Sequence, residues 1–580
     1  MACSSSAFVP RLSSCLAAAA AAAVFTIGAS SASAAIYSWL AKSGTGDWTT
    51  ASNWSLNSSY PGADAANLDV AQFNGDLTGP LGANLDTSVS IASLFLGDMV
   101  QDGGVSWYPT TVSTTNASTL RFVTTGTAII SLVGANSAGT ENLIAPDIFI
   151  NAPTLEFRNN LTSGGGANGR GNLALTGNVT SGTTGNHIIR VTPAGNTTNT
   201  CTWDFRGTIT DGPGVVSFFF RKDGTSGSSA TRTIKLSGTG NTFSGGINFT
   251  GGPGAIIESS PASGTTGALG TGLITAITGS NATLNLGGSF STVTEVAGIN
   301  IGAGTKRIAN IGAGHRILSG TVNQASGQPL TLACSDAGNL TLSNVISSGA
   351  AAGGITINGT GSGKVIFSGN NTYGGATTVT QGAFQLNGLL SGSSNLSVAA
   401  LGWLGGTGTA SGTATISGGT LSPGATTGVL SLGSLTLTST STVLIDLLAA
   451  GTRGTDYDGL TILNAGGLTY GGTMSLAFGG SRLPDNTTFS IFNFTGSPSG
   501  GFGQVLSTGY YAGTWTNNLD GTYSLAKDAQ TLTFAQSTGI VTIVPEPTSV
   551  VAVLSGIALT VICHRRRVGR SDQGDIEPNT

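Results

Sequence analysis

Short runs in which apolar residues alternate with Thr or Asn recur along most of this chain. They are separated by Gly, Asn, Ser and Thr, and they are most regular over 91–420, as in Thr283–Leu286 and Gly354–Gly359. An alternation with a period of two predicts strands that bury one face. Helical periodicity is absent outside the two ends of the chain, so the sequence predicts an all-β fold.

The composition excludes several other kinds of chain. Glycine accounts for 91 of the 580 residues, and charged residues account for only 8%. Low charge together with an apolar fraction of 39% argues against disorder, which needs high net charge and low hydrophobicity. The glycines lack the three-residue period of collagen. A formal net charge of −4 gives no footprint for nucleic acid binding.

Two segments, 234–257 and 364–388, match each other and indicate a repeated unit. Each places an Asn-Thr-aromatic triplet and a Gly-Gly pair between two strand-like runs. The shared positions are Asn241, Thr242, Phe243, Gly245 and Gly246 in the first copy and Asn371, Thr372, Tyr373, Gly374 and Gly375 in the second. Asn and Gly tolerate a left-handed backbone, so we expect a corner and a turn there. We also expect the Asn to bind local backbone groups and the ring to fill the interior.

The matched units resemble the autotransporter-associated β-strand repeat, in which Leu-Ser-Gly, Asn-Thr-Tyr, Gly-Gly and Thr-Thr-Val elements follow one another. The resemblance implies a right-handed parallel β-helix, or solenoid, like an autotransporter passenger. Asn241 and Asn371 lie 130 residues apart, which leaves room for about three to six coils between them. We therefore expect a β-solenoid over residues 91–469.

Tryptophans gather before this region. Trp39, Trp48 and Trp54 lie close together, and the first coil of a solenoid needs a cover. We therefore expect an N-terminal aromatic cap over residues 35–90. The alternative is that these indole rings form an exposed platform for sugars.

Aromatic residues also become frequent after the repeats. Their number across 470–543 indicates a more globular C-terminal β cap. Within it, the Asp-Gly pair of Thr516–Tyr523 predicts a hairpin.

Residues 1–34 have the features of a secretory signal peptide. Arg11 precedes an apolar run, and the small residues Ala32 and Ala34 occupy the −3 and −1 positions before Ala35. We expect the Sec export machinery to recognise this segment and cleavage to follow Ala34. The alternative, an N-terminal anchor helix, fits less well because the apolar run is short.

The C-terminus carries an apolar run between a proline motif and a basic cluster. The elements are Pro545, Glu546 and Pro547, the run 548–563, and Arg565, Arg566 and Arg567. A helix over this run would reach about 24 Å, short of a hydrocarbon core of ~30 Å. We expect a short transmembrane helix, with 571–580 as a cytoplasmic tail because Arg favours that side. The sequence predicts α-helix only here and in the signal peptide.

This order of elements, over 544–570, resembles the PEP-CTERM sorting signal of Gram-negative bacteria. In that family an exosortase, a membrane cysteine protease, is taken to cleave the tail, and the cargo passes to the cell surface or extracellular matrix. The resemblance implies a precursor tethered to the inner membrane by its C-terminal helix. We expect the mature form at the cell surface or outside the cell, with exopolysaccharide as a further partner.

Few side chains offer chemistry for catalysis or metal binding. His187 and His315 lack the His-x-x-His and His-Glu-x-x-His spacings of zinc sites, and we expect both on solvent-facing loops or edges. Cys201 and Cys334 are the only cysteines of the exported body. A disulfide between them is open, although two buried thiols are the simpler interpretation.

Asp456 and Asp458 are the weak candidates for a metal site or an acid–base pair. On a strand, residues two apart would place both carboxylates on one face, where they would suit Ca²⁺ or a polysaccharide hydrolase. The simpler interpretation is a loop, because Gly454–Gly459 has the composition of a turn. We therefore expect no metal and no cofactor.

These features lead to one main functional hypothesis and two alternatives. We expect an exported, non-enzymatic surface or matrix solenoid with a structural or adhesive role. A cluster of three or more carboxylates or arginines in one groove would instead favour a β-helical polysaccharide lyase or hydrolase. An intact C-terminus in the mature protein would favour a permanently membrane-anchored surface protein.

Overall fold

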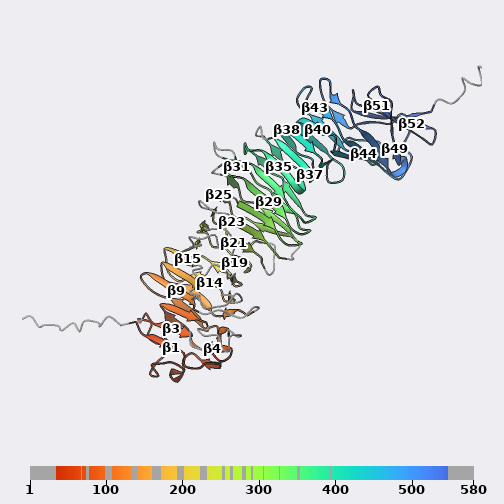
Figure 1. Ribbon diagram of the computed structural model, residues 1–580. Helices are drawn as coiled ribbons and strands as arrows, with labels where there is room; N and C mark the ends of the chain where they lie inside the picture. Colours follow the sequence, from red (N-terminus) through yellow and green to blue (C-terminus); the bar gives the residue numbers. More distant parts are fainter. Residues whose placement is uncertain are drawn as a thin grey trace, which may run out of the picture.

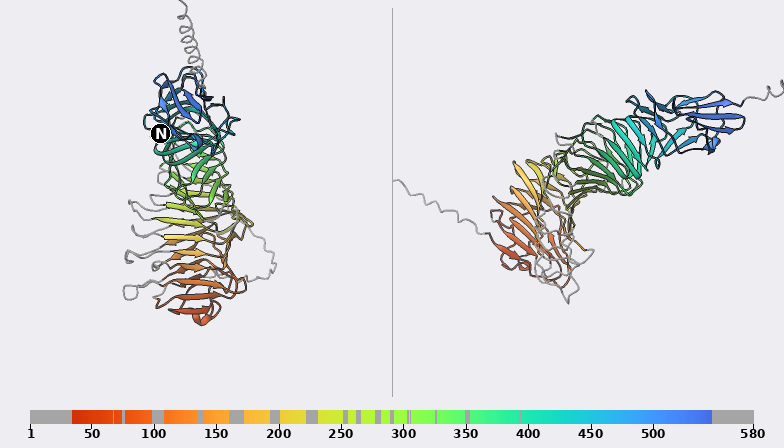
Figure 2. Two further views of the ribbon diagram at one scale, coloured as in Figure 1. Left: turned by 90° about the vertical axis from the view of Figure 1, so that its right-hand side faces the viewer. Right: turned by 45° about the horizontal axis from the view of Figure 1, so that its top comes forward.

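A computed structural model describes residues 34–546 apart from short internal segments. Those segments are 67, 74–76, 98–107, 134–139, 160–171, 193–200, 222–230, 251–254, 262–265, 277–281, 289–291, 303, 305, 325–326, 349–352 and 392–394. Figure 1 shows an elongated body, with β1 (Ile36–Ser38) near one end and β51 (Thr522–Lys527) near the other. The body curves along its length (Figure 2). The predicted signal peptide up to residue 33 and the predicted helix 548–563 lie outside the described residues.

Each coil contributes up to three strands, and strands in the same position of successive coils pair in parallel to form three faces. The first face is a 12-stranded sheet. Its strands are β1, β3 (Val70–Phe73), β6 (Ser93–Leu96), β9 (Thr127–Leu132), β12 (Thr154–Asn159), β15 (Asn186–Thr192), β18 (Val215–Arg221), β20 (Ile247–Thr250), β22 (Ile274–Ala276), β25 (Ile299–Ile301), β28 (Val322–Gln324) and β31 (Ile346–Ser348).

The other two faces follow the same rule. The second face contains β2 (Gly44–Asp47), β4 (Leu81–Leu85), β7 (Thr110–Thr114), β10 (Asn142–Ile144), β13 (Leu173–Leu175), β16 (Cys201–Phe205), β19 (Arg232–Leu236), β21 (Ala255–Ser259), β23 (Ala282–Leu286), β26 (Lys306–Asn310), β29 (Leu330–Cys334) and β32 (Ile355–Asn358). The third face contains β5 (Val89–Ile91), β8 (Thr119–Phe122), β11 (Asp147–Ile150), β14 (Val179–Ser181) and β17 (Ile209–Thr210), and later β24 (Thr292–Glu295), β27 (His315–Leu318), β30 (Leu340–Leu342) and β33 (Lys364–Phe367).

From residue 377 onward, single long strands continue around the corners of the coil. β35 (Thr377–Leu386) begins on the second face, paired with β32, and ends on the third face, paired with β33. A left-handed Gly382, with φ of 87°, and a break in the pairing register just before it produce the bend. The long strands β37 (Leu396–Gly406), β38 (Thr409–Ser417) and β40 (Val429–Leu437) turn corners in the same way.

Shorter strands complete these coils. They are β34 (Asn370–Asn371), β36 (Leu389–Leu390), β39 (Thr420–Pro423), β41 (Thr442–Leu447), β42 (Gly459–Ile462), β43 (Leu468–Tyr470), β44 (Thr473–Phe478), β46 (Phe492–Asn493), β47 (Ser499–Gly500), β48 (Gln504–Thr508) and the antiparallel β49 (Gly513–Thr514). The first face continues through β34, β36 and the first halves of β38 and β40. The parallel stack thus extends from β1 to β48.

The alternation seen in the sequence is what fills the interior of the coils. In β12, Leu155 and Phe157 are fully buried, whereas Arg158 of the same strand faces outward. The described residues form no α-helix, only the 3-10 turns Ala51–Asn53 and Gly509–Tyr511. Within this part of the chain no helix has the length and apolar character needed to cross a bilayer. The prediction of an all-β fold is therefore confirmed, and the parallel stack is that of a β-solenoid.

The N-terminal tryptophans lie inside the first coils. Trp39 and Trp54 meet edge to face with ring centroids 4.9 Å apart, and none of Trp39, Trp48 and Trp54 is more than 7% exposed. The alternative of an exposed sugar platform is therefore wrong. Parallel pairing already begins where β1 bonds to β3, so residues 35–90 contain coils as well as the aromatic cluster.

The C-terminal region ends in a five-stranded antiparallel sheet. Its strands are β45 (Thr488–Ser490), β53 (Ile540–Pro545), β52 (Gln530–Ala535), β51 and β50 (Thr516–Asn517). β50 and β51 form the predicted hairpin, in which Thr516 pairs with Ser524. Phe534 of this sheet lies 6.0 Å, between ring centroids, from Phe502, and 6.3 Å from Tyr470 of the last coils. The segment 470–543 thus contains both the last coils and the antiparallel sheet.

The two matched segments make the same corner. Asn241 Oδ1 accepts a hydrogen bond from a backbone N–H of the preceding coil at 2.8 Å, and Asn371 Oδ1 accepts one at 2.9 Å. Phe243 and Tyr373 are both buried in the interior. The predicted burial of the aromatic ring is confirmed, and both Asn side chains bind backbone. The backbone is local for Asn371, whose Nδ2 donates to Gly369 O, but the prediction of a local partner is wrong for Asn241, which bonds to Ile209 N and Ala268 O of the neighbouring coils.

The two corners nevertheless lie on different faces. The N–H bound by Asn241 belongs to Ile209 of the third face, whereas that bound by Asn371 belongs to Ile346 of the first face. The matched units are therefore not stacked on one another, because 130 residues is not a whole number of coils. The repeat specifies a strand, a corner and a second strand, but it does not specify on which face of the solenoid the corner lies.

The glycine pairs serve two different purposes. Gly246 has φ of 77°, the left-handed backbone that we expect of this turn. Gly375 has an ordinary φ, and a Cβ there would lie only 2.1 Å from the carbonyl oxygen of Gly353 in the preceding coil. The left-handed prediction is thus wrong for Gly375, where close approach of two coils excludes a side chain.

Candidate functional site

The two weak metal candidates, Asp456 and Asp458, lie in the loop between β41 and β42. Asp456 Oδ2 accepts a hydrogen bond from Thr452 N at 2.6 Å. The buried Asp458 accepts bonds from Gly428 N at 2.8 Å and Asp446 N at 2.9 Å. Burial raises the pKa of Asp458 to about 7. Both carboxylates hold backbone in place, and the described residues contain no group of three or more His, Cys, Asp or Glu side chains that would hold a metal ion.

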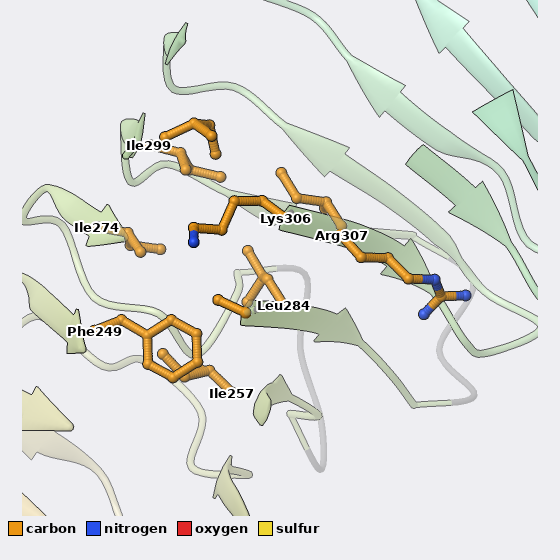
Figure 3. A pocket seen from close by; sticks show the side chains of 10 residues that line it. Phe249, Ile257, Ile274, Leu284, Ile299, Lys306 and Arg307 are labelled. Carbon is orange, nitrogen blue, oxygen red and sulfur yellow. The ribbon is translucent and has the colours of Figure 1, made fainter. Parts of the chain in front are cut away.

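A small cavity lies in the interior between the first and second faces. Phe249, Ile274 and Leu284 line it, and Lys306 points its amine into it, whereas Arg307 points away (Figure 3). Burial lowers the pKa of Lys306. The cavity measures about 30 Å³, which is room for about two water molecules and far too little for a sugar ring.

The histidines and cysteines offer no reactive pair. His187 is buried in β15, and its ring nitrogens lie 2.8 Å from Ala152 O and 3.0 Å from Thr183 O, so our prediction of a solvent-facing position is wrong for it. His315 is exposed, as predicted. Cys201 and Cys334 are free and buried, and burial raises the pKa of each thiol to about 11.

Charged side chains cluster on the outside of the earlier coils. On the first face, Glu156 Oε2 lies 2.8 Å from Arg158 Nη2 and 4.0 Å from Arg190 Nη1. Burial alone would raise the pKa of Glu156, but hydrogen bonds from Arg158 and Thr192 and the charges of both arginines lower it. On the outside of the second face, Arg206 bridges Glu141 and Asp204. In these coils the carboxylates of Glu156, Glu141 and Asp204 each form an ion pair with an arginine.

The later coils are different, because no charged residue occurs between Lys364 and Asp446. Their second face presents one outward hydroxyl for each coil, half-buried or exposed. In register, this hydroxyl ladder consists of Thr331, Thr356, Thr378, Ser397, Thr415, Thr436, Thr469 and Ser499. Neighbouring strands lie about 4.8 Å apart, so the hydroxyls repeat at that spacing along the axis.

Trp403 stands out on the adjoining third face. Of the six tryptophans that the structure describes, five are buried and Trp403 is half-buried on the outer side of β37. Its ring lies across Gly405, where a Cβ would sit 2.1 Å from Cη2 of the indole. Lys364 Nζ lies 4.7 Å from the ring centroid, and the register places only the small Ala383 between the two residues.

Apart from Lys364, the side chains on the strands around this indole are apolar or uncharged. Leu401, 71% exposed, precedes Trp403 on the same strand. Gln381 and Gln385 flank the ring from the preceding coil, and Thr420 pairs with Trp403 in the next. An indole packs on the apolar C–H face of a sugar ring, while amides and hydroxyls bond its hydroxyl groups. The Trp403 surface, defined by these residues and Lys364, therefore suits a glycan.

Sequence reasoning missed this surface. Leu396, Val398 and Leu404 are buried on the same strand, so one alternation runs through the bend and already places Trp403 on the outside. A second available signal is the absence of charge between Lys364 and Asp446, which marks these coils as chemically distinct.

The predicted processing sites adjoin the folded body. Ala35 O accepts a hydrogen bond from Val70 N at 2.8 Å, and Ala34 is exposed. Pro545 is the last residue of β53, and Glu546 N bonds to Ala529 O at 2.9 Å. The other predicted positions of these signals, Ala32, Pro547, Arg565, Arg566 and Arg567, lie outside the described residues.

The chain matches no known family profile, no curated protein and no solved structure.

Proposed function

We propose that this protein is an exported, non-enzymatic β-solenoid that binds polysaccharide at the cell surface or in the extracellular matrix. The observation that carries the proposal is the Trp403 surface, where a half-exposed indole and a lysine lie among uncharged polar groups. A repetitive polymer suits a repetitive protein surface, and the hydroxyl ladder offers one hydrogen-bonding group for each coil. Because Lys364 is the one charged residue of the Trp403 surface, the preferred ligand is an acidic polysaccharide.

The finer architecture is part of the proposal. We infer right-handed coils from the likeness of the matched units to the autotransporter-associated repeat. The buried tryptophan cluster at the β1 end supports an N-terminal aromatic cap, because its large rings cover the interior there. The antiparallel sheet supports a C-terminal cap, since it pairs the last strands in a direction that cannot continue the coil.

Export and sorting complete the proposal. The signal peptide directs the chain through the Sec machinery, and the PEP-CTERM-like tail tethers the precursor to the inner membrane of a Gram-negative bacterium until an exosortase-type protease acts. The exposed ends of the folded body at Ala34 and Glu546 support this order, because both junctions are accessible.

Binding to purified polymers tests the function. The full chain should bind polygalacturonate or alginate more tightly than uncharged dextran. Trp403→Ala should weaken binding by about tenfold or more, since a stacked aromatic is a typical binding hot spot. Lys364→Gln should remove the preference for the acidic polymer. The matched control is Phe219→Ala, which removes an outward aromatic beside Arg190 in the charged coils and should leave binding unchanged.

Two results would contradict the proposal. The first is a folded wild-type chain that binds neither polymer. The second is a cell that lacks the protein and keeps an unaltered surface matrix. Unchanged binding by Trp403→Ala would reject the Trp403 surface alone.

One observation favours the second candidate, a polysaccharide-cleaving β-helix. Glu156, Arg158 and Arg190 form a group of three charges on one face, and arginines beside a carboxylate are what cleavage of an acidic sugar chain would use. Incubation of the full chain with acidic polysaccharides, followed by assay of new reducing ends and unsaturated products, tests it. Product that disappears in Glu156→Gln would establish the enzyme.

A further inference from the structure

The residue that follows the predicted cleavage site is fixed against a buried carboxylate. Ala35 N donates to Asp69 Oδ1 at 3.3 Å, and its carbonyl oxygen accepts from Val70 N at 2.8 Å. Ala35 is half-buried directly before β1, whereas Ala34 is exposed. The folded body therefore begins at Ala35.

Asp69 lies in an environment that calls for a positive charge. It is 1% exposed, and its second oxygen accepts a hydrogen bond from Gly62 N at 3.0 Å. Within the described residues both oxygens meet backbone N–H groups and no cationic side chain. A buried carboxylate held only by neutral donors is costly, and an opposite charge at the same place removes most of that cost.

We propose that Asp69 is the binding site for the N-terminal ammonium group that signal-peptide removal creates at Ala35. Hydrolysis of the Ala34–Ala35 peptide bond adds one water: Ala34 leaves as a carboxylate, and the nitrogen of Ala35 becomes an ammonium group. The one N–H that Ala35 offers to Asp69 is thus replaced by a positive charge with three donors, and the bond from Gly62 N is kept. Processing thereby completes an ion pair that fixes the first coil, and the unprocessed chain lacks it.

The inference rests on the export step of the proposed function and is independent of glycan binding. The exposed Asp64 of the same loop, which accepts a hydrogen bond from Ala66 N, provides a comparison. Asp64→Asn is therefore the matched control for Asp69→Asn.

Hydrogen exchange on the full chain tests the ion pair. The processed protein, shown by mass spectrometry to begin at Ala35, is compared with a precursor whose signal peptide is retained by substitution at Ala34. Exchange at Val70, whose N–H bonds to Ala35, should be about tenfold slower in the processed form. Asp69→Asn should abolish the difference, and Asp64→Asn should keep it.

Chemical labelling of the N-terminal amine provides a readout that does not depend on how well the Asp69 variant folds. In the processed wild type, acetylation of the Ala35 amine at neutral pH should be about tenfold slower than in the urea-unfolded chain. Equal labelling rates, equal exchange in precursor and processed chain, or a mature N-terminus other than Ala35 would overturn the inference. None of these results would alter polysaccharide binding, so they leave the proposed function standing.

Discussion

Residues 140–260 and residues 365–445 form coils of the same solenoid, but the outer surfaces of the two regions differ in charge. The earlier coils are long, and Thr154 pairs with Ile188, thirty-four residues later. The later coils are short, and Leu396 pairs with Ala414 after eighteen residues. Fifteen charged residues occur in the first stretch and none in the second. What they share is the interior, where an Asn corner and a buried ring recur in both.

This difference shows that inward and outward residues of a solenoid are subject to different constraints on their sequence. Inward residues must fill the interior of each coil, so both stretches use aliphatic and aromatic side chains there. Outward residues only have to tolerate water. The earlier coils therefore carry ion pairs, and the later ones a hydroxyl ladder and an indole.

The largest expected effect tests the shared interior. Phe243→Ala and Tyr373→Ala should each destabilise their coil by about 3–5 kcal/mol, because each leaves a cavity where a buried ring stood. Native-state hydrogen exchange should show lost protection in the neighbouring coils. The outward Phe219→Ala is the control, with a loss below ~1 kcal/mol. Equal losses for all three would break the distinction between interior and outside.

The next effect is a pH dependence of stability at the end of the uncharged coils, where the buried Asp458 follows Asp446. Burial raises the pKa of Asp458 from its ordinary value of 3.8 to about 7, so the folded chain keeps a proton that the unfolded chain releases. The stabilisation is complete below pH 4 and is lost as the pH rises through about 7, at ~1.4 kcal/mol for each unit of pKa. Denaturant unfolding from pH 4 to 8 should show this slope, and Asp458→Asn should flatten it. A parallel pH profile for both proteins would refute the assignment.

A smaller effect compares the two corners directly. Asn241→Ala and Asn371→Ala leave the N–H groups of Ile209 and Ile346 without their acceptor, at a cost of about 1–3 kcal/mol each. Faster amide exchange at those two residues is the measurement. The outward Asn248→Ala should change neither. A loss at one corner only would show that the matched segments are not equivalent.

The smallest effect separates the two surfaces. Glu156→Gln should cost below ~1 kcal/mol, because Arg158 is 41% exposed and solvent screens the pair. The pKa of Glu156 is lowered in the folded state, so its contribution is present at neutral pH and is lost as the pH falls. Added salt should weaken the earlier coils and leave residues 365–445 unchanged, as read from regional exchange rates. Salt sensitivity in the uncharged coils would contradict the comparison.

The local rules of this fold were predictable, and their long-range arrangement was not. Period-two alternation identified the strands, and the Asn and aromatic roles followed from hydrogen bonding and size. The face on which each corner lies did not follow from the sequence, because coil length varies and two matching corners therefore lie on different faces. His187 was misplaced for a related reason, since one of the two carbonyls beside its ring, that of Ala152, comes from a residue that only the folded coil brings near. Trp403 was missed although the alternation of the buried Leu396, Val398 and Leu404 already places it outward.

The junction at Glu546 has a mechanical consequence. β53 lies between β45 and β52 and ends at Pro545, directly before the last described residue, Glu546. Any tension applied through the tail is therefore borne first by the hydrogen bonds of this one strand. The hydrogen bonds of β53 with β45 and β52 thus stand between such a pull and the coils.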